Sequence, residues 1–254
     1  MFGGWCGLLA RNGLEAVAHY YNQAISWRGS PDVVITAGEA GPFERRSLVS
    51  NIERGTLDEI QKDPWQTATC IGNWHYSRRI YEEGSYKSAR SVVQMLADVV
   101  SKNGNLLLNI PVRGDGTIDD EEEKILDGII EWTSRNGEAI FGSRPWRRFG
   151  EGPTRPPPAG AFGEGKANPL TSRDVRFTAK DGTLYAIFME WPEGESAISS
   201  LGAHAFPDAI IEKVELLGGP TLEFRRESEA LRLTLPRSPD GFIPTIRING
   251  HGLA

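Results

Sequence analysis

The chain has 254 residues, of which 39% are hydrophobic and 24% charged, and its net charge is −6 at pH 7. This composition is typical of a globular protein long enough to bury a core. No apolar run approaches the roughly 20 residues of a membrane span, and no basic footprint points to nucleic acid, so both of those classes are excluded. Two cysteines, Cys6 and Cys70, are too few for a disulfide framework or a cysteine-rich metal site. Residues 1–10 lack the basic and apolar regions of a signal peptide, which leaves the compartment unknown.

The first half of the sequence alternates helical and strand patterns. Three helices are expected, one over 14–27, one beginning at Ser85 and ending at Asn103-Gly104, and one beginning at Asp119 with a capping box to Glu122. The buried stripe of the last helix is predicted to comprise Ile125, Leu126, Ile129 and Ile130. Apolar runs predict strands over 32–36, 66–72 and 105–110, the last buried on both faces. This alternation predicts a parallel sheet covered by helices.

The second half of the sequence has a different periodicity. A stretch rich in proline and glycine, residues 148–168, predicts a linker. Beyond it, apolar residues alternate with polar ones, and turn signals such as Asp181-Gly182 separate the runs. The run over 184–189 is apolar throughout and is expected to be a central strand. We therefore predict a small antiparallel β-sandwich over 169–254, so that the whole chain combines an α/β unit with an all-β domain.

A carboxylate next to a guanidinium is the first candidate for chemistry, in Asn51-Ile52-Glu53-Arg54-Gly55. Glu53 just before a turn glycine suits a catalytic acid in a cleft. Exposed Glu–Arg neighbours are also common as surface ion pairs, and this segment by itself favours that interpretation.

Aromatic residues follow the strand predicted over 66–72. Trp74 and Tyr76 fall just beyond its end, where α/β barrels keep their active sites, and aromatic rings suit the C–H face of a sugar. The same rings could instead close the rim of a core, and the two alternatives are equally weighted. His75 is out of phase with its neighbours and is expected to be a hydrogen-bonding residue rather than a ligand.

Two further polar features are more consistent with structural roles. Asn109 ends a predicted strand and could point into a site, although a structural role is favoured. The acidic run over 119–123 could bind a cation, but the start of a helix explains it better, because acidic side chains stabilise the positive end of a helix dipole.

The order of these segments resembles the α-L-fucosidases of glycoside hydrolase family 29. The resemblance is dense over about 14–146 and looser through the second half. Its most specific part is the run Ser101-Lys102-Asn103-Gly104-Asn105-Leu106-Leu107-Leu108-Asn109. The other matching stretches are Ile52-Glu53-Arg54-Gly55, Pro64-Trp65-Gln66-Thr67, Trp74-His75-Tyr76, Tyr86-Lys87-Ser88-Ala89-Arg90, Asp115-Gly116-Thr117-Ile118, Asn136-Gly137-Glu138-Ala139-Ile140 and Arg144-Pro145-Trp146.

The resemblance implies a fold, an activity and two site residues. The fold is a (β/α)8-type barrel followed by a β-sandwich, with barrel residues over 1–147, the linker over 148–168 and the sandwich over 169–254. The activity is that of a retaining exo-glycosidase that removes terminal α-L-fucose from a glycan or glycoside through a glycosyl-enzyme. Glu53 stands at the position of the acid/base, and Trp74 stands where an aromatic ring would pack against fucose. The resemblance implies no metal or organic cofactor.

The departures from the family pattern lie at the beginning of the chain. The nucleophile of such enzymes is an Asp in a Trp-Phe-Asp-Gly-type strand end, and Met1-Phe2-Gly3-Gly4-Trp5 places Gly3 there. About half of the eight barrel strands are expected in this sequence. We therefore expect a truncated form with little hydrolase activity, and unpaired sheet edges that favour self-association. The alternative is a non-catalytic carbohydrate-binding or structural fragment built on the sandwich, whose only tryptophan is Trp191.

Overall fold

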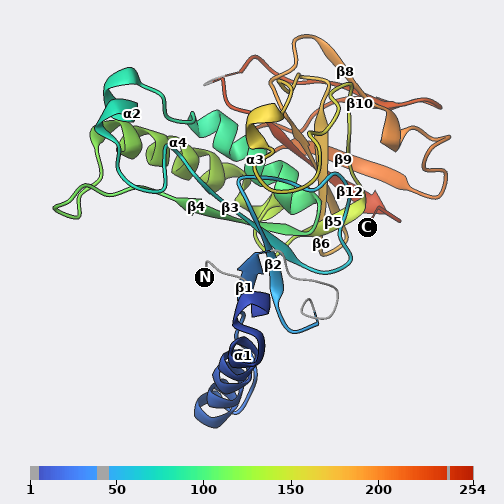
Figure 1. Cartoon of the computed structure of the whole chain (residues 1–254). Helices are drawn as coiled ribbons and strands as arrows, with labels where there is room; N and C mark the ends of the chain where they lie inside the picture. Colours follow the sequence, from blue (N-terminus) through green and yellow to red (C-terminus); the bar gives the residue numbers. More distant parts are fainter. Residues whose placement is uncertain (1–5, 39–45, 239–240, 254) are drawn as a thin grey trace.

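The structure is a computed structural model that describes residues 6–38, 46–238 and 241–253, with residues 6–11 described by their backbone alone. It combines a parallel sheet, a pair of packed helices and two antiparallel sheets (Figure 1). The arrangement confirms the predicted combination of a partial barrel with a β-sandwich.

The parallel sheet has four strands that follow one another in chain order. They are β1 (Thr36–Gly38), β2 (Val49–Glu53), β3 (Trp65–Cys70) and β4 (Gly104–Asn109). The first strand begins four residues later than the run predicted over 32–36. Val33 N–H donates to the Pro31 carbonyl in a tight turn, and the Val34 side chain is 64% exposed, so this apolar stretch is an approach to the sheet rather than a strand.

In the part of the chain that the structure describes, four α-helices accompany this sheet, and the longest lies apart from the others. They are α1 (Cys6–Arg28), α2 (Arg78–Glu83), α3 (Ala89–Ser101) and α4 (Asp120–Asn136). Figure 1 shows α1 extending away from the body of the molecule, beside β1. No helix within the described ranges is both long and apolar enough to cross a membrane.

The N-terminal cap predicted for α4 is confirmed, whereas the one predicted for α3 is wrong. Helix α4 has the predicted capping box, since the Asp119 side chain accepts from Glu122 N–H and the Glu122 side chain accepts from Asp119 N–H. Helix α3 begins at Ala89 with Ser88 as its cap, three residues after the predicted Ser85. The intervening residues lie along the end of β3, where Lys87 N–H donates to the Ile71 carbonyl.

Helices α3 and α4 lie between two sheets. One face of α3 packs on β4, with Trp65 and Val99 side chains meeting over Gly104. On the other side, Val93, Ala97 and Trp132 pack against β7 residues of the sandwich. The predicted stripe of α4 is wrong at Ile130, which is 62% exposed, while Trp132 is buried and donates its indole N–H to the Ile243 carbonyl.

The two faces of the parallel sheet differ in chemistry. Strand register places Asn51, Gln66 and Asn105 in one row, on the face away from α3. On this face Asn105 is exposed and Leu107 is 37% exposed, which corrects the expectation that the 105–110 strand is buried on both faces. This face carries amides as well as apolar side chains, because alternate residues of neighbouring parallel strands align across the sheet. It is exposed at β4 but buried at β2 and β3, where Asn51 and Ala68 are 8% and 1% exposed.

The β-sandwich consists of a five-stranded and a three-stranded antiparallel sheet. The larger sheet has the order β5 (Arg144–Glu151), β6 (Val175–Lys180), β7 (Thr183–Phe188), β12 (Thr245–His251) and β9 (Ile210–Leu216). The smaller has the order β10 (Phe224–Arg226), β11 (Leu231–Thr234) and β8 (Glu195–Ile198). Strand β7 is central, as its uninterrupted apolar run predicts.

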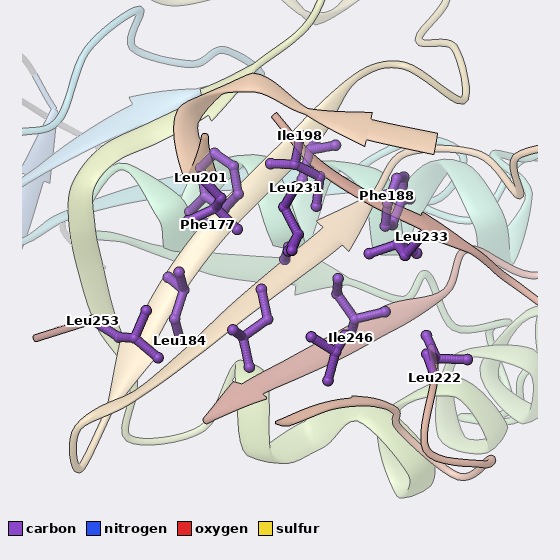
Figure 2. Close-up of a cluster of buried hydrophobic side chains, with 14 of the residues drawn as sticks. Phe177, Leu184, Phe188, Ile198, Leu201, Leu222, Leu231, Leu233, Ile246 and Leu253 are labelled. Carbon is purple, nitrogen blue, oxygen red and sulfur yellow. The ribbon is translucent and has the colours of Figure 1, made fainter. Parts of the chain in front are cut away.

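Apolar side chains from both sheets form the core of the sandwich (Figure 2). Phe177, Leu184 and Ile246 come from the larger sheet, and Ile198 and Leu231 from the smaller, all with essentially no exposed surface. Figure 2 shows these side chains pointing into the space between the sheets. Trp191, from the connection between β7 and β8, is half-buried and donates its indole N–H to the Pro236 carbonyl.

Strand β5 lies where the sequence predicts the end of the barrel and the start of a linker. It pairs with β6, so residues 148–151 belong to the sandwich sheet rather than to a loop. The Trp146 ring contacts Phe177 and Phe206 edge-on, at centroid distances of 5.1 and 5.5 Å, and its indole N–H donates to the Leu253 carbonyl. These contacts make Trp146 part of the sandwich core. The division of the chain into domains stays a prediction.

Candidate active site

The site begins at the carboxyl ends of two neighbouring parallel strands. Glu53 is the last residue of β2, and Trp74 lies four residues after the end of β3. The Trp74 indole Nε1 donates a hydrogen bond to Glu53 Oε1 over 3.0 Å. Both side chains are half-buried. The fold therefore brings together the two residues that the sequence singles out, at the edge of the sheet where α/β proteins place their ligands.

Strand register places Glu53 on the amide-rich face of the sheet. Its neighbour across the ladder is Ala68, which is buried. Two residues earlier on each strand, on the same face of the sheet, Gln66 Nε2 donates a hydrogen bond to Asn51 Oδ1 over 2.7 Å. This amide pair fixes β2 against β3 just behind the carboxylate.

A second asparagine holds the loop that carries Trp74. Asn109, at the end of β4, directs its Nδ2 to the carbonyls of Asn73 and Trp74, at 3.4 and 3.3 Å. The Trp74 N–H also donates to Asn73 Oδ1. Asn109 thus has the structural role that the sequence favours, at the border of the candidate site. His75 is exposed.

The segment after β5 returns to the end of β2, and residues 160–164 are called the strap here. Three strap N–H groups donate to β2-end carbonyls: Gly160 to Thr56, Phe162 to Glu53 and Glu164 to Arg54, at 2.9, 2.8 and 3.0 Å. The approach requires glycine at position 55, because a Cβ there would lie 1.9 Å from the Gly160 carbonyl oxygen. The stretch expected to be a linker is therefore attached to the backbone of Glu53.

Glu164 is the functional neighbour that sequence reasoning missed. Its carboxylate accepts from Arg54 Nε at 2.6 Å, from Thr69 Oγ1 at 2.7 Å and from Lys87 Nζ at 3.2 Å. Burial by itself would raise the pKa of Glu164, but the hydrogen bonds from Thr69 and Arg54 and the charge of Lys87 outweigh it and hold the pKa below the ordinary value. Arg54 therefore pairs with Glu164, which leaves Glu53 to Trp74.

The signal for Glu164 is weak in the sequence because it lies among glycines, prolines and alanines. The residues it contacts, Arg54 and Lys87, both lie in stretches that carry the family resemblance. A basic residue in each of two such stretches is the sequence feature that could have prompted a search for an acidic partner.

The chemistry available at this edge is that of a single positioned carboxyl group. Glu53 can donate or accept one proton, and the Trp74 ring presents an apolar face beside it. The predicted nucleophile position, Gly3, lies outside the described residues. Among the residues that the structure describes, no cluster of His, Cys, Asp and Glu could hold a metal ion.

Comparison with known proteins assigns the family. Residues 15–138 match the family described as Alpha-L-fucosidase, and residues 167–248 match the one described as Alpha-L-fucosidase C-terminal domain. The chain belongs to the α-L-fucosidase family. The first match contains both Glu53 and Trp74, and the second contains most of the sandwich.

Individual α-L-fucosidases show the same relationship. Rat plasma α-L-fucosidase is 33% identical over 187 residues, which cover 68% of this chain and 37% of the rat protein. Human tissue α-L-fucosidase is 29% identical over 195 residues, which cover 73% of this chain and 37% of the human protein. Thermotoga maritima α-fucosidase, solved in complex with fucose, superposes with a TM-score of 0.69 at 25% identity, over 94% of this chain and 50% of that structure.

The chain is shorter than the α-L-fucosidases it resembles. It spans about a third of the length of the curated relatives and half that of the solved structures. The matched part of the fold nevertheless includes the carboxyl ends of β2 and β3, where Glu53 and Trp74 lie.

Proposed function

We propose that this chain carries the acid/base and sugar-packing part of a retaining α-L-fucosidase site. The observation that supports this most directly is the Trp74–Glu53 hydrogen bond at the carboxyl edge of the parallel sheet. The bond joins an aromatic ring to a carboxyl group, the pair that the family resemblance assigns to the two roles. The bond lies at the carboxyl edge of the sheet, where α/β barrels bind their substrates.

In the proposed reaction Glu53 acts twice. Retaining glycosidases use two carboxyl groups about 5–5.5 Å apart, one as nucleophile and one as acid/base. In a site that also holds the nucleophile, Glu53 would donate its proton to the glycosidic oxygen while the nucleophilic carboxylate bonds to C1 of fucose and the C1–oxygen bond breaks. It would then take a proton from the water that hydrolyses the glycosyl-enzyme. The indole N–H of Trp74 holds one carboxyl oxygen and so fixes the direction of the group.

The proposed substrate is a terminal α-L-fucoside of a glycan or glycoside. The Trp74 ring would pack against the C–H face of the sugar, which is a favourable contact for an aromatic surface. The T. maritima enzyme, whose structure contains fucose, supports this choice of sugar.

We further propose that the chain by itself hydrolyses fucosides little or not at all. Glycine at position 3 offers no carboxylate to attack C1, and loss of a covalent nucleophile removes the two-step route. The substitution Gly3→Asp would place a carboxylate at that position.

Release of nitrophenol from an aryl α-L-fucoside tests both roles. We expect no measurable release by the natural chain, release by the Gly3→Asp variant, and loss of that release when Glu53→Gln is added. Release by the natural chain, or no gain in Gly3→Asp, would refute the assignment of position 3. A gain that Glu53→Gln leaves unchanged would refute the acid/base role.

A further inference from the structure

A cavity lies between the strap and α3, with Glu164 and Met95 both in its wall. It has a volume of about 560 Å³ and is bounded by α3, by the end of β2 and by residues 154–170. Much of its wall is apolar, and it includes side chains of Ile71, Met95, Pro156, Pro157, Pro169 and Leu170. The cavity is therefore suited to a ligand that has an apolar frame.

More cationic than anionic side chains line this cavity. Four cationic side chains line it, Arg54, Lys87, Arg155 and Arg176, against two carboxylates, Asp98 and Glu164. An excess of fixed positive charge in a partly enclosed space favours an anionic ligand, because the surrounding protein screens the charges less than water does.

Both carboxylates are already engaged with two cations each. Glu164 lies 2.6 Å from Arg54 Nε and 3.2 Å from Lys87 Nζ. Asp98 lies 2.6 Å from Arg176 Nε and, with its other oxygen, 2.6 Å from Lys102 Nζ. Neither carboxylate is free to balance a further cation.

Arg155 supplies a cation without an internal partner. Its side chain is exposed at the border of the cavity and makes no hydrogen bond or ion pair with any residue in the described ranges. Arg54 and Lys87, which line the same cavity, keep 33% and 21% of their side-chain surface exposed despite their contacts with Glu164.

We propose that this cavity binds an organic anion, a compound that carries a carboxylate, phosphate or sulfonate group on an apolar frame. The oxyanion would contact Arg155 together with Arg54 or Lys87, and the frame would lie against Met95 and Leu170. Arg176 is held in place behind them by Asp98 and by the Phe149 ring, 5.4 Å from its guanidinium carbon. The site is separate from the fucoside site and does not depend on it.

Calorimetric titration with p-toluenesulfonate, at constant ionic strength and without any fucoside, tests this proposal. The neutral p-toluenesulfonamide has the same frame, and inorganic sulfate has the charge without the frame. We expect the sulfonate to bind at least about tenfold more tightly than either, since both the frame and a charge-assisted hydrogen bond contribute. Equal affinity for sulfonate and sulfonamide would overturn the charge argument, and equal affinity for sulfonate and sulfate would overturn the role of the apolar wall.

Two substitutions test where the anion binds, one that removes a positive charge from the cavity and one that removes a negative charge. Arg155→Gln should weaken sulfonate binding by about tenfold, and Arg148→Gln, which removes an exposed arginine of β5 outside this cavity, should leave it unchanged. Glu164→Gln should tighten binding, because Arg54 and Lys87 lose their internal carboxylate. Arg155 is exposed, so its substitution does not endanger the fold. Equal affinities for the Arg155→Gln and Arg148→Gln variants would overturn the proposal.

Discussion

Trp74 and Glu53 meet through one hydrogen bond, from the indole Nε1 to Oε1 at 3.0 Å, although Glu53 ends β2 and Trp74 lies in the loop after β3. The bond separates two contributions of the tryptophan, its N–H group and its aromatic face. Trp74→Phe keeps an aromatic ring and removes the donor, whereas Trp74→Ala removes both.

The first prediction concerns fucose binding by these two variants. Trp74→Phe should change the affinity for L-fucose by no more than about twofold, and Trp74→Ala should weaken it about tenfold, because packing of the ring supplies most of the contact. Titration followed by sugar-proton NMR measures both. Tyr20→Ala, at an exposed aromatic position on α1, is the matched control and should bind as the natural chain does. Equal losses in Phe and Ala variants would contradict the packing role.

The second prediction concerns Glu164 and pH. Its pKa is lower in the folded chain than in the unfolded one, so its contribution to stability is present above the ordinary value of 4.5 and is lost as the pH falls through the folded value. At pH 7, Glu164→Gln should lower the free energy of unfolding by about 1 to 2 kcal/mol, because the partners Arg54 and Lys87 are partly exposed.

Urea unfolding of the natural chain and the variant at several pH values checks this expectation. The difference between them should shrink as the pH falls below 4.5. Glu82→Gln removes an exposed ion pair with Arg78 and should leave the free energy of unfolding nearly unchanged at any pH, because solvent screens that pair. A Glu164 difference that is constant from pH 7 to pH 3 would refute the electrostatic explanation.

The third prediction concerns the cap of α4. Asp119 accepts from Glu122 N–H at 2.8 Å and from the Tyr86 hydroxyl at 2.6 Å. Asp119→Ala should therefore destabilise the chain by about 1 to 2 kcal/mol, and Asp119→Asn, which keeps a capping oxygen, by less. Thermal unfolding followed by circular dichroism compares the two. Equal destabilisation by both substitutions would show that the capping geometry is not the cause.

The fourth prediction concerns the position of Trp146. Trp146→Ala should cost about 3 to 5 kcal/mol, because it empties a buried site between Phe177 and Phe206. Trp27→Ala is the control, since that ring is 77% exposed on α1 and its loss should change stability by less than about 0.5 kcal/mol. A small effect at Trp146 would contradict its place in the sandwich core.

Local patterns predict much of this fold. The capping box at Asp119, the apolar run of β7 and the turn at Asp181-Gly182 each depend on neighbours in sequence, and the structure confirms them; Asp181 and Gly182 have φ values of +50° and +80°. Local patterns give wrong predictions where burial depends on whether a segment distant in sequence covers the residue. Residues 105–110 are as apolar as a buried strand, but one face of β4 is uncovered, so Leu107 is exposed.

The candidate site shows the same limit. The sequence names Trp74 because it follows the strand predicted over 66–72, and it names Glu53 because that carboxylate lies beside Arg54 just before a turn glycine. Parallel strands then bring their carboxyl ends to one edge of the sheet. Glu164 lies in a stretch of prolines and glycines, which predicts a loop but not its destination. Its contacts with Arg54 and Thr69 span 110 and 95 residues, and no local periodicity reports a pairing across such a distance.

The most direct test of a fucose site at Glu53 and Trp74 is an NMR titration of the Trp74 indole N–H signal, which is assigned by its loss in Trp74→Phe. We predict that L-fucose shifts this signal saturably and that its enantiomer, D-fucose, does not. An unmoved signal, or equal shifts with both enantiomers, would contradict a site built to recognise fucose.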